Sequence, residues 1–173
     1  MSTPFLTETI KTLKVGDQIL LSGTVYTGRD AAHKRMVEIL EKNLPLPFEA
    51  NGQAIYYTGP CPAPPGKFIG SAGPTTSTRM DSYAPKLIRE GIRVMIGKGD
   101  RNQAVIDAII RYTGLYLAAV GGAGALLSQC VKQAEVLAFG DLGPEAIYKL
   151  TVCDMPLTVA IDCEGRNIYR RKI

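Results

Sequence analysis

Apolar and polar residues follow two different periods along this chain, and the periods predict strands and helices in succession. The segment 18–28 alternates apolar and β-branched residues with polar ones as a strand does, whereas 31–43 spaces its apolar residues along one helical face. The same patterns predict further strands over 54–60, 92–97, 115–122, 134–140, 148–154 and 156–162. Further helices are predicted over 79–91, 102–112 and 123–133.

Strands that alternate with helices are typical of an α/β domain. The β-rich ends of the pattern favour a mixed, partly parallel sheet with flanking helices over a purely parallel one. The 173 residues contain no repeat, low-complexity segment or linker, so we expect a single domain over 1–173. Asp30 is placed to cap the helix 31–43, and Pro85 to kink the helix 79–91 or lie in its first turn.

Composition excludes several classes of protein. A hydrophobic content of 46% and a charged content of 21% are ordinary for a globular protein, and no apolar run is long enough for a membrane span. The first residues lack the pattern of a secretory signal, which favours a cytoplasmic location. The net charge of +4 is densest in a tail that we interpret as a solvated terminus, Arg166, Arg170, Arg171 and Lys172. Without a basic stripe and interleaved aromatic residues, no nucleic-acid partner is expected.

The four cysteines do not have the spacing of a metal site. They form neither a CxxC pair nor a cluster with histidine, so we expect no metal ligands in this chain. The missing secretory signal also disfavours disulfides. Most of the four are therefore predicted to be buried free thiols, at Cys61, Cys130, Cys153 and Cys163.

Three cationic residues lie near the ends of predicted strands. Arg29 follows the first strand, Arg79 follows a run of hydroxyl residues, and Lys98 follows the strand 92–97. Ligands of open α/β folds bind at such strand ends, and three cations suit a small dianion or a phosphate. Taken singly, each cation is more often a solvated side chain.

The sequence GPTTSTRMDSY at 73–83 has more hydroxyl groups than a helix start needs. A hydroxyl of Thr76, Ser77 or Thr78 is expected to cap the following helix. That leaves Thr75 and Arg79, four residues apart, unexplained. Because a helix N-terminus attracts anions, the segment is predicted to hold a carboxylate beside a threonine hydroxyl.

Two other features allow more than one interpretation. The run GGAGA at 121–125 hints at phosphate binding but lacks the third glycine of GxGxxG, and close packing of a strand on a helix is the commoner cause. His33 is the only histidine of the chain and has no visible serine or cysteine partner. It lies either in the core or at the site.

Four separated segments carry a resemblance that covers nearly the whole chain. GPTTSTRMDSY resembles the GPTT-x-x-RM-D/E-S signature of the β subunit of class I, iron–sulfur-dependent fumarases. The β subunit of L(+)-tartrate dehydratase is similar. The other matching segments are SGTVYTGRDAAHKR (22–35), VMIGKGD (94–100) and the stretch from EVLAFGDLGPEAI to PLTVAID (135–162).

The resemblance implies a swivelling β/β/α domain that acts as a hydro-lyase on (S)-malate and fumarate. It implies that an α subunit binds a [4Fe–4S] cluster whose open iron takes the leaving hydroxyl, in a hetero-oligomer such as α2β2. By the same resemblance Arg29, Arg79 and Lys98 bind the substrate, with Arg79 also catalytic, and Thr75 is the general base. Surrounding residues with an expected supporting role are Asp30, His33, Thr76 and Asp81.

The departures from the family pattern leave the substrate open. Thr78 stands where these fumarases often have glycine, and Gly28 where tartrate dehydratases tend to have cysteine, while 135–150 looks more like a fumarase. We therefore expect a fumarase β subunit, with a tartrate dehydratase β subunit or related hydro-lyase as the alternative. A third reading is a non-catalytic module that binds small dicarboxylates.

Overall fold

Six strands form the framework, in a computed structural model that describes residues 1–119 and 124–170. The strands are β1 (Gln18–Thr27), β2 (Ala54–Tyr56), β3 (Val94–Gly97), β4 (Leu115–Ala118), β5 (Val131–Ala138) and β6 (Ile147–Ile161). The helices are α1 (Thr7–Thr12), α2 (Asp30–Glu41), α3 (Ala84–Arg89), α4 (Gln103–Tyr112) and α5 (Gly124–Gln129). Three 3₁₀ turns are η1 (Ser77–Met80), η2 (Gly140–Glu145) and η3 (Ile168–Arg170).

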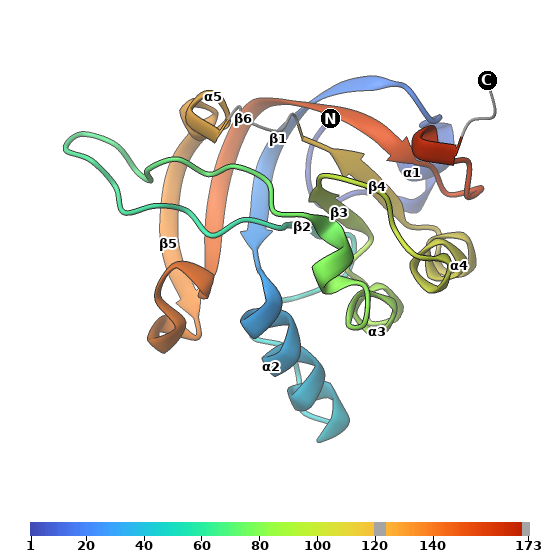
Figure 1. Cartoon of the computed structure of the whole chain (residues 1–173), viewed down its shortest axis with the longest axis horizontal. Coiled ribbons are helices and arrows are strands. Elements are labelled where there is room, and N and C mark those ends of the chain that lie inside the picture. Colours follow the sequence, from blue (N-terminus) through green and yellow to red (C-terminus); the bar gives the residue numbers. More distant parts are fainter. Residues whose placement is uncertain (120–123, 171–173) are drawn as a thin grey trace.

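The sheet is mixed, as predicted. Strands β1 to β4 are parallel neighbours in sequence order, and the long β6 runs antiparallel to β4, β1 and β5. Because β6 pairs with both β4 and β1, five strands close on themselves and β5 extends the sheet along β6 (Figure 1). The predicted α/β class, with a partly parallel sheet and flanking helices, is confirmed.

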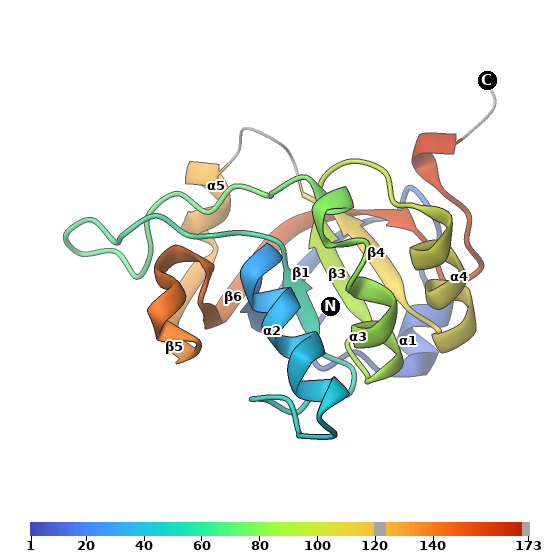
Figure 2. The ribbon, with the colours of Figure 1, turned by 60° about the horizontal axis from the view of Figure 1, so that its bottom comes forward.

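Alternate residues of the central strands pack into two separate apolar clusters. Val94 and Ile96 point into one cluster with β1, β6, α1 and α5, whereas Met95 between them points into the other. Helices α2, α3 and α4 cover this second face (Figure 2). The period of two in a strand thus places both faces of the sheet in apolar surroundings.

Two of the predicted element boundaries are wrong for local reasons. The helix over 79–91 divides into η1 and α3, and Pro85 lies in the first turn of α3, where its missing N–H costs nothing. The strands 148–154 and 156–162 are one strand, β6. The chain passes the break at Asp154, whose φ is 51°, because the Asp154 amide donates to Ser22 Oγ in place of a ladder partner.

Two further predictions fail because tertiary pairing overrides the local pattern. The helix over 123–133 ends at Gln129 among the described residues, since Val131 and its successors pair with β6. Asp30 is the first residue of α2 and not its N-cap, a position that Arg29 occupies without a side-chain capping bond. The short helix α1 was not predicted.

The cysteines are free thiols, but they are not buried. Cys61 and Cys153 are exposed, and Cys130 and Cys163 are half-buried. The prediction of buried thiols is therefore wrong. Cys61, Cys130 and Cys163 lie outside the strands and helices, and Cys153 lies within β6 beside the irregularity at Asp154.

Candidate active site

The parallel strands β1, β2 and β3 end at one edge of the sheet, and the predicted cations gather there. Arg29 comes two residues after β1, and Lys98 comes directly after β3. The segment after β2 returns to the same edge, where Thr76 makes an isolated parallel bridge to Lys98. Chain connections that are distant in sequence thus meet at the place where α/β folds bind ligands.

Asp30 joins the two predicted arginines. Arg79 Nε donates to Asp30 Oδ1 at 2.9 Å, and Arg29 Nε lies 3.9 Å from Asp30 Oδ2. Both pairs are partly exposed, with side-chain exposures of 49% for Arg79, 33% for Asp30 and 24% for Arg29. One carboxylate therefore holds two guanidinium groups side by side at the surface, and each keeps N–H donors for an anion.

Glu145 belongs to this cluster, and sequence reasoning missed it. Its Oε1 lies 3.1 Å from Arg29 Nη2, and its Oε2 accepts from the Ala31 amide at 3.3 Å. One side chain thus holds the arginine and an amide of the first turn of α2. No local signal marks Glu145, because it comes from η2, more than a hundred residues after Arg29 in the chain.

Thr75 and Lys98 are placed by main-chain bonds. The Thr75 amide donates to the Tyr57 carbonyl at 2.6 Å, and the Ser77 amide donates to the Lys98 carbonyl at 2.9 Å. The Lys98 side chain is exposed, and within the described residues its ammonium has no ion-pair partner. The Thr75 hydroxyl is likewise without a bond to another described side chain. Both groups are available to a ligand.

The hydroxyl run does not cap a helix as expected. Thr76 is the N-cap of η1 but makes no side-chain cap bond, and Thr78 is exposed. Ser77 is completely buried, and its hydroxyl lies 2.8 Å from the hydroxyl of Tyr116 on β4. The capping prediction is therefore wrong. The buried serine instead connects the loop to the sheet.

His33 lies in the core beneath Arg29. It is completely buried, its Nδ1 is 2.9 Å from the Arg29 carbonyl, and its ring meets that of Tyr57 edge-on at 5.1 Å. Burial lowers the pKa of His33 to about 4, so the imidazole is neutral at physiological pH. Nδ1 therefore carries the proton and donates to the carbonyl. His33 supports the turn that presents Arg29.

Asp81 faces inward and pairs with a buried arginine that the sequence did not reveal. Arg101 Nε donates to Asp81 Oδ1 at 2.6 Å, and the Asn102 amide donates to the other carboxylate oxygen at 2.8 Å. The guanidinium carbon lies 5.3 Å from the Tyr57 ring centre and 5.0 Å from that of Tyr116. This buried pair joins the end of η1 to the loop between β3 and α4.

Most of the glycine run GGAGA lies outside the described residues, as do Arg171 and Lys172 of the tail. Gly124 begins α5, and a Cβ there would lie 2.5 Å from Ser71 Oγ and 2.8 Å from the Gly73 amide nitrogen. This close approach requires glycine at position 124 and favours the packing interpretation there.

The described residues 1–119 and 124–170 contain no group of three or more His, Cys, Asp or Glu side chains able to hold a metal ion. The resemblance assigns the [4Fe–4S] cluster to an α subunit, and the described side chains of this chain offer no set of ligands for it. None of the described helices combines the length and apolar character that crossing a membrane demands.

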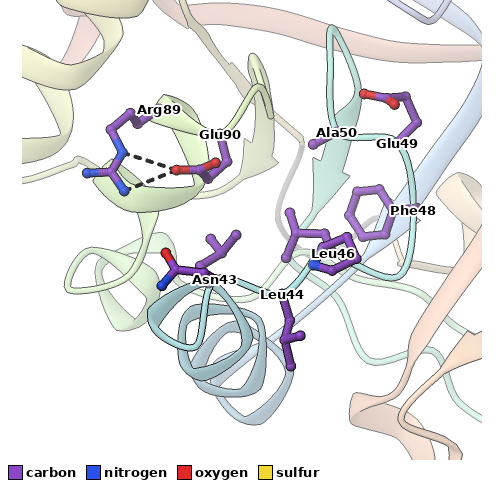
Figure 3. Close-up of a pocket in the computed structure, with 10 residues that line it drawn as sticks. Asn43, Leu44, Leu46, Phe48, Glu49, Ala50, Arg89 and Glu90 are labelled. Atoms are coloured by element: carbon purple, nitrogen blue, oxygen red, sulfur yellow. Dashed lines mark hydrogen bonds and ion pairs between the residues drawn. The ribbon is translucent and has the colours of Figure 1, made fainter.

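A pocket lined by residues of 40–50 and by Arg89 and Glu90 is separate from the arginine cluster. It lies at the C-terminal end of α2, whereas Arg29 is at the N-terminal end of that helix. Figure 3 shows its apolar side chains, Leu44, Leu46 and Phe48, and the ion pair of Arg89 with Glu90 at its rim. No cluster of cations or hydroxyl groups lines it, so the strand-end edge is the better candidate for chemistry on an anion.

Comparison with known proteins shows the family of the chain. The family model described as the C-terminus of fumarase matches residues 1–172. An anaerobic class I fumarate hydratase of Escherichia coli is 39% identical over 91% of this chain, and fumarate hydratase 2 of Leishmania major is 38% identical over 92%. A putative L(+)-tartrate dehydratase subunit beta of Methanocaldococcus jannaschii is 40% identical over 92%.

The extent of these matches differs between the two kinds of relative. The chain spans 28% and 29% of the two fumarate hydratases, but 85% of the tartrate dehydratase subunit. The similarity is thus to one region of a longer enzyme in the first case and to most of a separate subunit in the second. The chain belongs to the family of the fumarase C-terminal region, whose members include hydro-lyases.

Proposed function

We propose that this chain is the β subunit of a two-subunit class I fumarate hydratase, which converts (S)-malate and fumarate into each other. The observation that carries the proposal is the cluster of Arg29, Arg79 and Asp30 at the strand-end edge, next to the turn of Lys98. The family membership supports hydro-lyase chemistry, and the relative described as a subunit beta supports a separate chain. We further propose that the complex works in the cytoplasm.

The charges of the cluster suit a dicarboxylate. Arg29 and Arg79 pair with two carboxylates, Asp30 and Glu145, and Lys98 adds a third cation, so the three cations exceed the two carboxylates by one charge without the substrate. In the proposal Arg29 and Arg79 each bind a substrate carboxylate with their free N–H donors, and Lys98 provides a third positive charge. Asp30 holds the two guanidinium groups together while the substrate binds.

Thr75 is the proposed general base that removes a proton at the carbon next to the leaving hydroxyl group. A threonine hydroxyl is a weak base at its ordinary pKa, so the role requires a strongly positive environment. The proposed sources of that charge are Arg79, four residues later, and Lys98, whose carbonyl accepts from the Ser77 amide. Thr76 is proposed to hold this loop against Lys98 through its main chain.

The remaining parts of the reaction are assigned to the partner. We propose that an α subunit supplies a [4Fe–4S] cluster, which acts as a Lewis acid toward the leaving hydroxyl. Arg79 is half exposed and Lys98 is exposed, so the site of this chain is an open surface. A partner that covers it would exclude water and complete the site.

Substitution of Arg79 tests the proposal in the complex with the α subunit, prepared without oxygen. Arg79→Met is expected to lower kcat/KM for malate by at least about a hundredfold, because a charged partner of the substrate is lost. Arg89→Met is the matched control, since Arg89 is an exposed arginine of α3 that pairs with its neighbour Glu90. Comparable activity of the two variants would contradict the assignment of the site.

A tartrate dehydratase β subunit is the second candidate, favoured by the 85% coverage of that relative. The structure bears on the Gly28 position, where the resemblance associates cysteine with tartrate dehydratases. A Cβ at Gly28 would lie 3.0 Å from Ile55 Cδ1 and 3.3 Å from His33 Cε1, so this packing suits glycine. Turnover of malate and of L(+)-tartrate by the same complex separates the candidates. Faster turnover of tartrate would replace the first proposal by the second.

A further inference from the structure

A chain of buried groups connects the loop of Thr75 and Arg79 with the turn of Lys98. The Ser77 hydroxyl lies 2.8 Å from the Tyr116 hydroxyl, which donates to the Gly99 carbonyl at 2.9 Å. Ser77 and Tyr116 are both completely buried. Ser77 lies between the two residues proposed to act on the substrate, and Gly99 follows the proposed cation.

The direction of these bonds follows from their chemistry. A carbonyl oxygen only accepts, so the single proton of the Tyr116 hydroxyl goes to Gly99. The Ser77 hydroxyl must then donate to the Tyr116 oxygen. Burial raises the pKa of Tyr116, which keeps this hydroxyl protonated and able to donate at physiological pH. The bonds therefore run from Ser77 through Tyr116 to Gly99.

Close packing fixes this chain of bonds on the end of β3. The Ser77 amide donates to the Lys98 carbonyl at 2.9 Å, so serine contacts the turn through main chain and side chain together. A Cβ on Gly97 would lie 2.1 Å from Ser77 Oγ, which means that only glycine allows the serine to approach this closely. Arg101, whose guanidinium carbon is 5.0 Å from the centre of the Tyr116 ring, packs against the same tyrosine.

Lys98 depends on this support more than the two arginines do. Side-chain ion pairs hold Arg79 to Asp30 and Arg29 to Glu145 and Asp30, whereas the Lys98 ammonium has no such partner among the residues described. Its location is set by the main chain of its turn. That turn passes through Gly99 with a φ of 83°, and the Tyr116 hydroxyl binds its carbonyl.

We propose that Tyr116 is a positioning residue of the active site, and that its hydroxyl holds Lys98 in register with Thr75 and Arg79. The proposal rests on the proposed function, because it assumes that Lys98 binds the substrate. Tyr116 is completely buried, so it acts on the substrate only through the Lys98 turn and Ser77.

Activity of the complex with the α subunit provides the first test. Tyr116→Phe keeps the ring and removes both bonds, and we expect kcat/KM for malate to fall between about tenfold and a hundredfold. Ser77→Ala leaves the bond to Gly99 intact and is expected to have a smaller effect. Tyr56→Phe is the matched control, because the buried Tyr56 hydroxyl binds the Ala72 carbonyl and does not contact the Lys98 turn.

A double-mutant cycle separates positioning from a general loss of structure. If Tyr116 acts through Lys98, Tyr116→Phe has little further effect in a Lys98→Met background. Malate affinity replaces kcat/KM in the cycle if Lys98→Met is too slow to assay. Tyr56→Phe should have the same effect in both backgrounds. An undiminished effect of Tyr116→Phe beside Lys98→Met, or none in the wild type, would overturn the proposal.

Amide hydrogen exchange in the isolated full chain tests the positioning role of Tyr116 independently of the proposed function. A wild-type complex without activity on malate or tartrate would refute the proposed function alone. The position of the turn is then measured by exchange at the Ser77 amide, which the Lys98 carbonyl protects. Faster exchange in Tyr116→Phe, at unchanged global stability, supports the positioning role. Equal exchange in the variant and the wild type contradicts it.

Discussion

Two arginine–aspartate pairs each include a residue in or next to η1, Arg79 in one pair and Asp81 in the other, and they differ mainly in burial. Arg79 and Asp30 are joined at 2.9 Å with side chains 49% and 33% exposed, whereas Arg101 and Asp81 are joined at 2.6 Å with side chains 0% and 6% exposed. The bond chemistry is the same in both. Their surroundings therefore decide which pair can exchange its partner for a ligand and which cannot.

Among the described residues, Arg101 and Asp81 have no ion-pair partner other than each other. Asp81 accepts from Arg101 and from the Asn102 amide, and two tyrosine rings flank the guanidinium group. Separation of this pair would leave a charge in apolar surroundings. The Arg79 pair is screened by water, and its guanidinium group can bind a carboxylate at little cost. An exposed pair suits a binding site, and a buried pair suits a support.

The largest expected effect comes from breaking the buried pair. Arg101→Met leaves the Asp81 carboxylate buried without its cation, so the free energy of unfolding should fall by about 3–5 kcal/mol. Urea denaturation of the isolated chain measures this. A fall of less than about 1 kcal/mol would mean that water reaches Asp81 and that the contrast between the two pairs is wrong.

The double variant Arg101→Met with Asp81→Leu serves as the control for that experiment. Removal of both charges takes away the penalty of an unpaired carboxylate, so much of the lost stability should return. A double variant that is less stable than Arg101→Met would show that the two charges are needed individually. The cost would then not arise from an unpaired carboxylate.

His33 links the two regions and gives the next effect in size. It bonds the Arg29 carbonyl, packs against Tyr57, and has Arg101 and Asp30 as the nearby charges that affect its pKa. The unfolded chain takes up a proton near pH 6.5, whereas the folded chain does so only near pH 4. Stability is therefore complete above pH 6.5 and falls as the pH drops toward 4, by about 3 kcal/mol in all.

A titration of stability checks this prediction. His33 is the only histidine, so His33→Asn should remove the slope between pH 6.5 and 5, where the wild type is expected to lose up to about 1.4 kcal/mol per pH unit. Asparagine keeps a donor for the Arg29 carbonyl. Equal slopes in wild type and variant would show that the imidazole is protonated in the folded state above pH 5.

Periodicity predicted the mixed fold and the edge of the sheet that bears the site, because strand and helix patterns are local properties of the sequence. Arg29 and Lys98 follow the strands β1 and β3 as expected. The boundaries failed where long-range contacts decide, as at Val131, which pairs with β6 in place of extending a helix. The roles of Thr75 and Arg79 stay predictions.

The partners of the site residues could not be predicted from the sequence. Glu145 reaches Arg29 from a distant turn, and Arg101 looks like an ordinary surface arginine in a turn after Asp100. Ser77 was expected to cap a helix, but the absent Cβ of Gly97 lets it approach the sheet and meet Tyr116. Such contacts depend on which elements pack together, which the residue spacing does not encode.

A moderate effect is expected from loss of Glu145. Glu145→Gln keeps an acceptor for the Ala31 amide but removes the charge that faces Arg29, at a side chain 27% exposed. The free energy of unfolding should fall by about 1 kcal/mol or less, since the pair is partly solvated. Malate affinity of the complex should change more than kcat does, because Arg29 loses its orientation. An unchanged affinity would show that Asp30 alone positions Arg29.

The smallest expected effect is that of Arg79→Met on stability, and it completes the contrast with Arg101→Met. Arg79 has half of its side chain in water, so the free energy of unfolding should change by less than about 1 kcal/mol. The difference should shrink further at high salt, because screening weakens exposed pairs more than buried ones. Urea denaturation at low and high salt measures both. A loss near that of Arg101→Met would mean that Arg79 is a structural residue, and its activity defect would then say nothing about substrate binding.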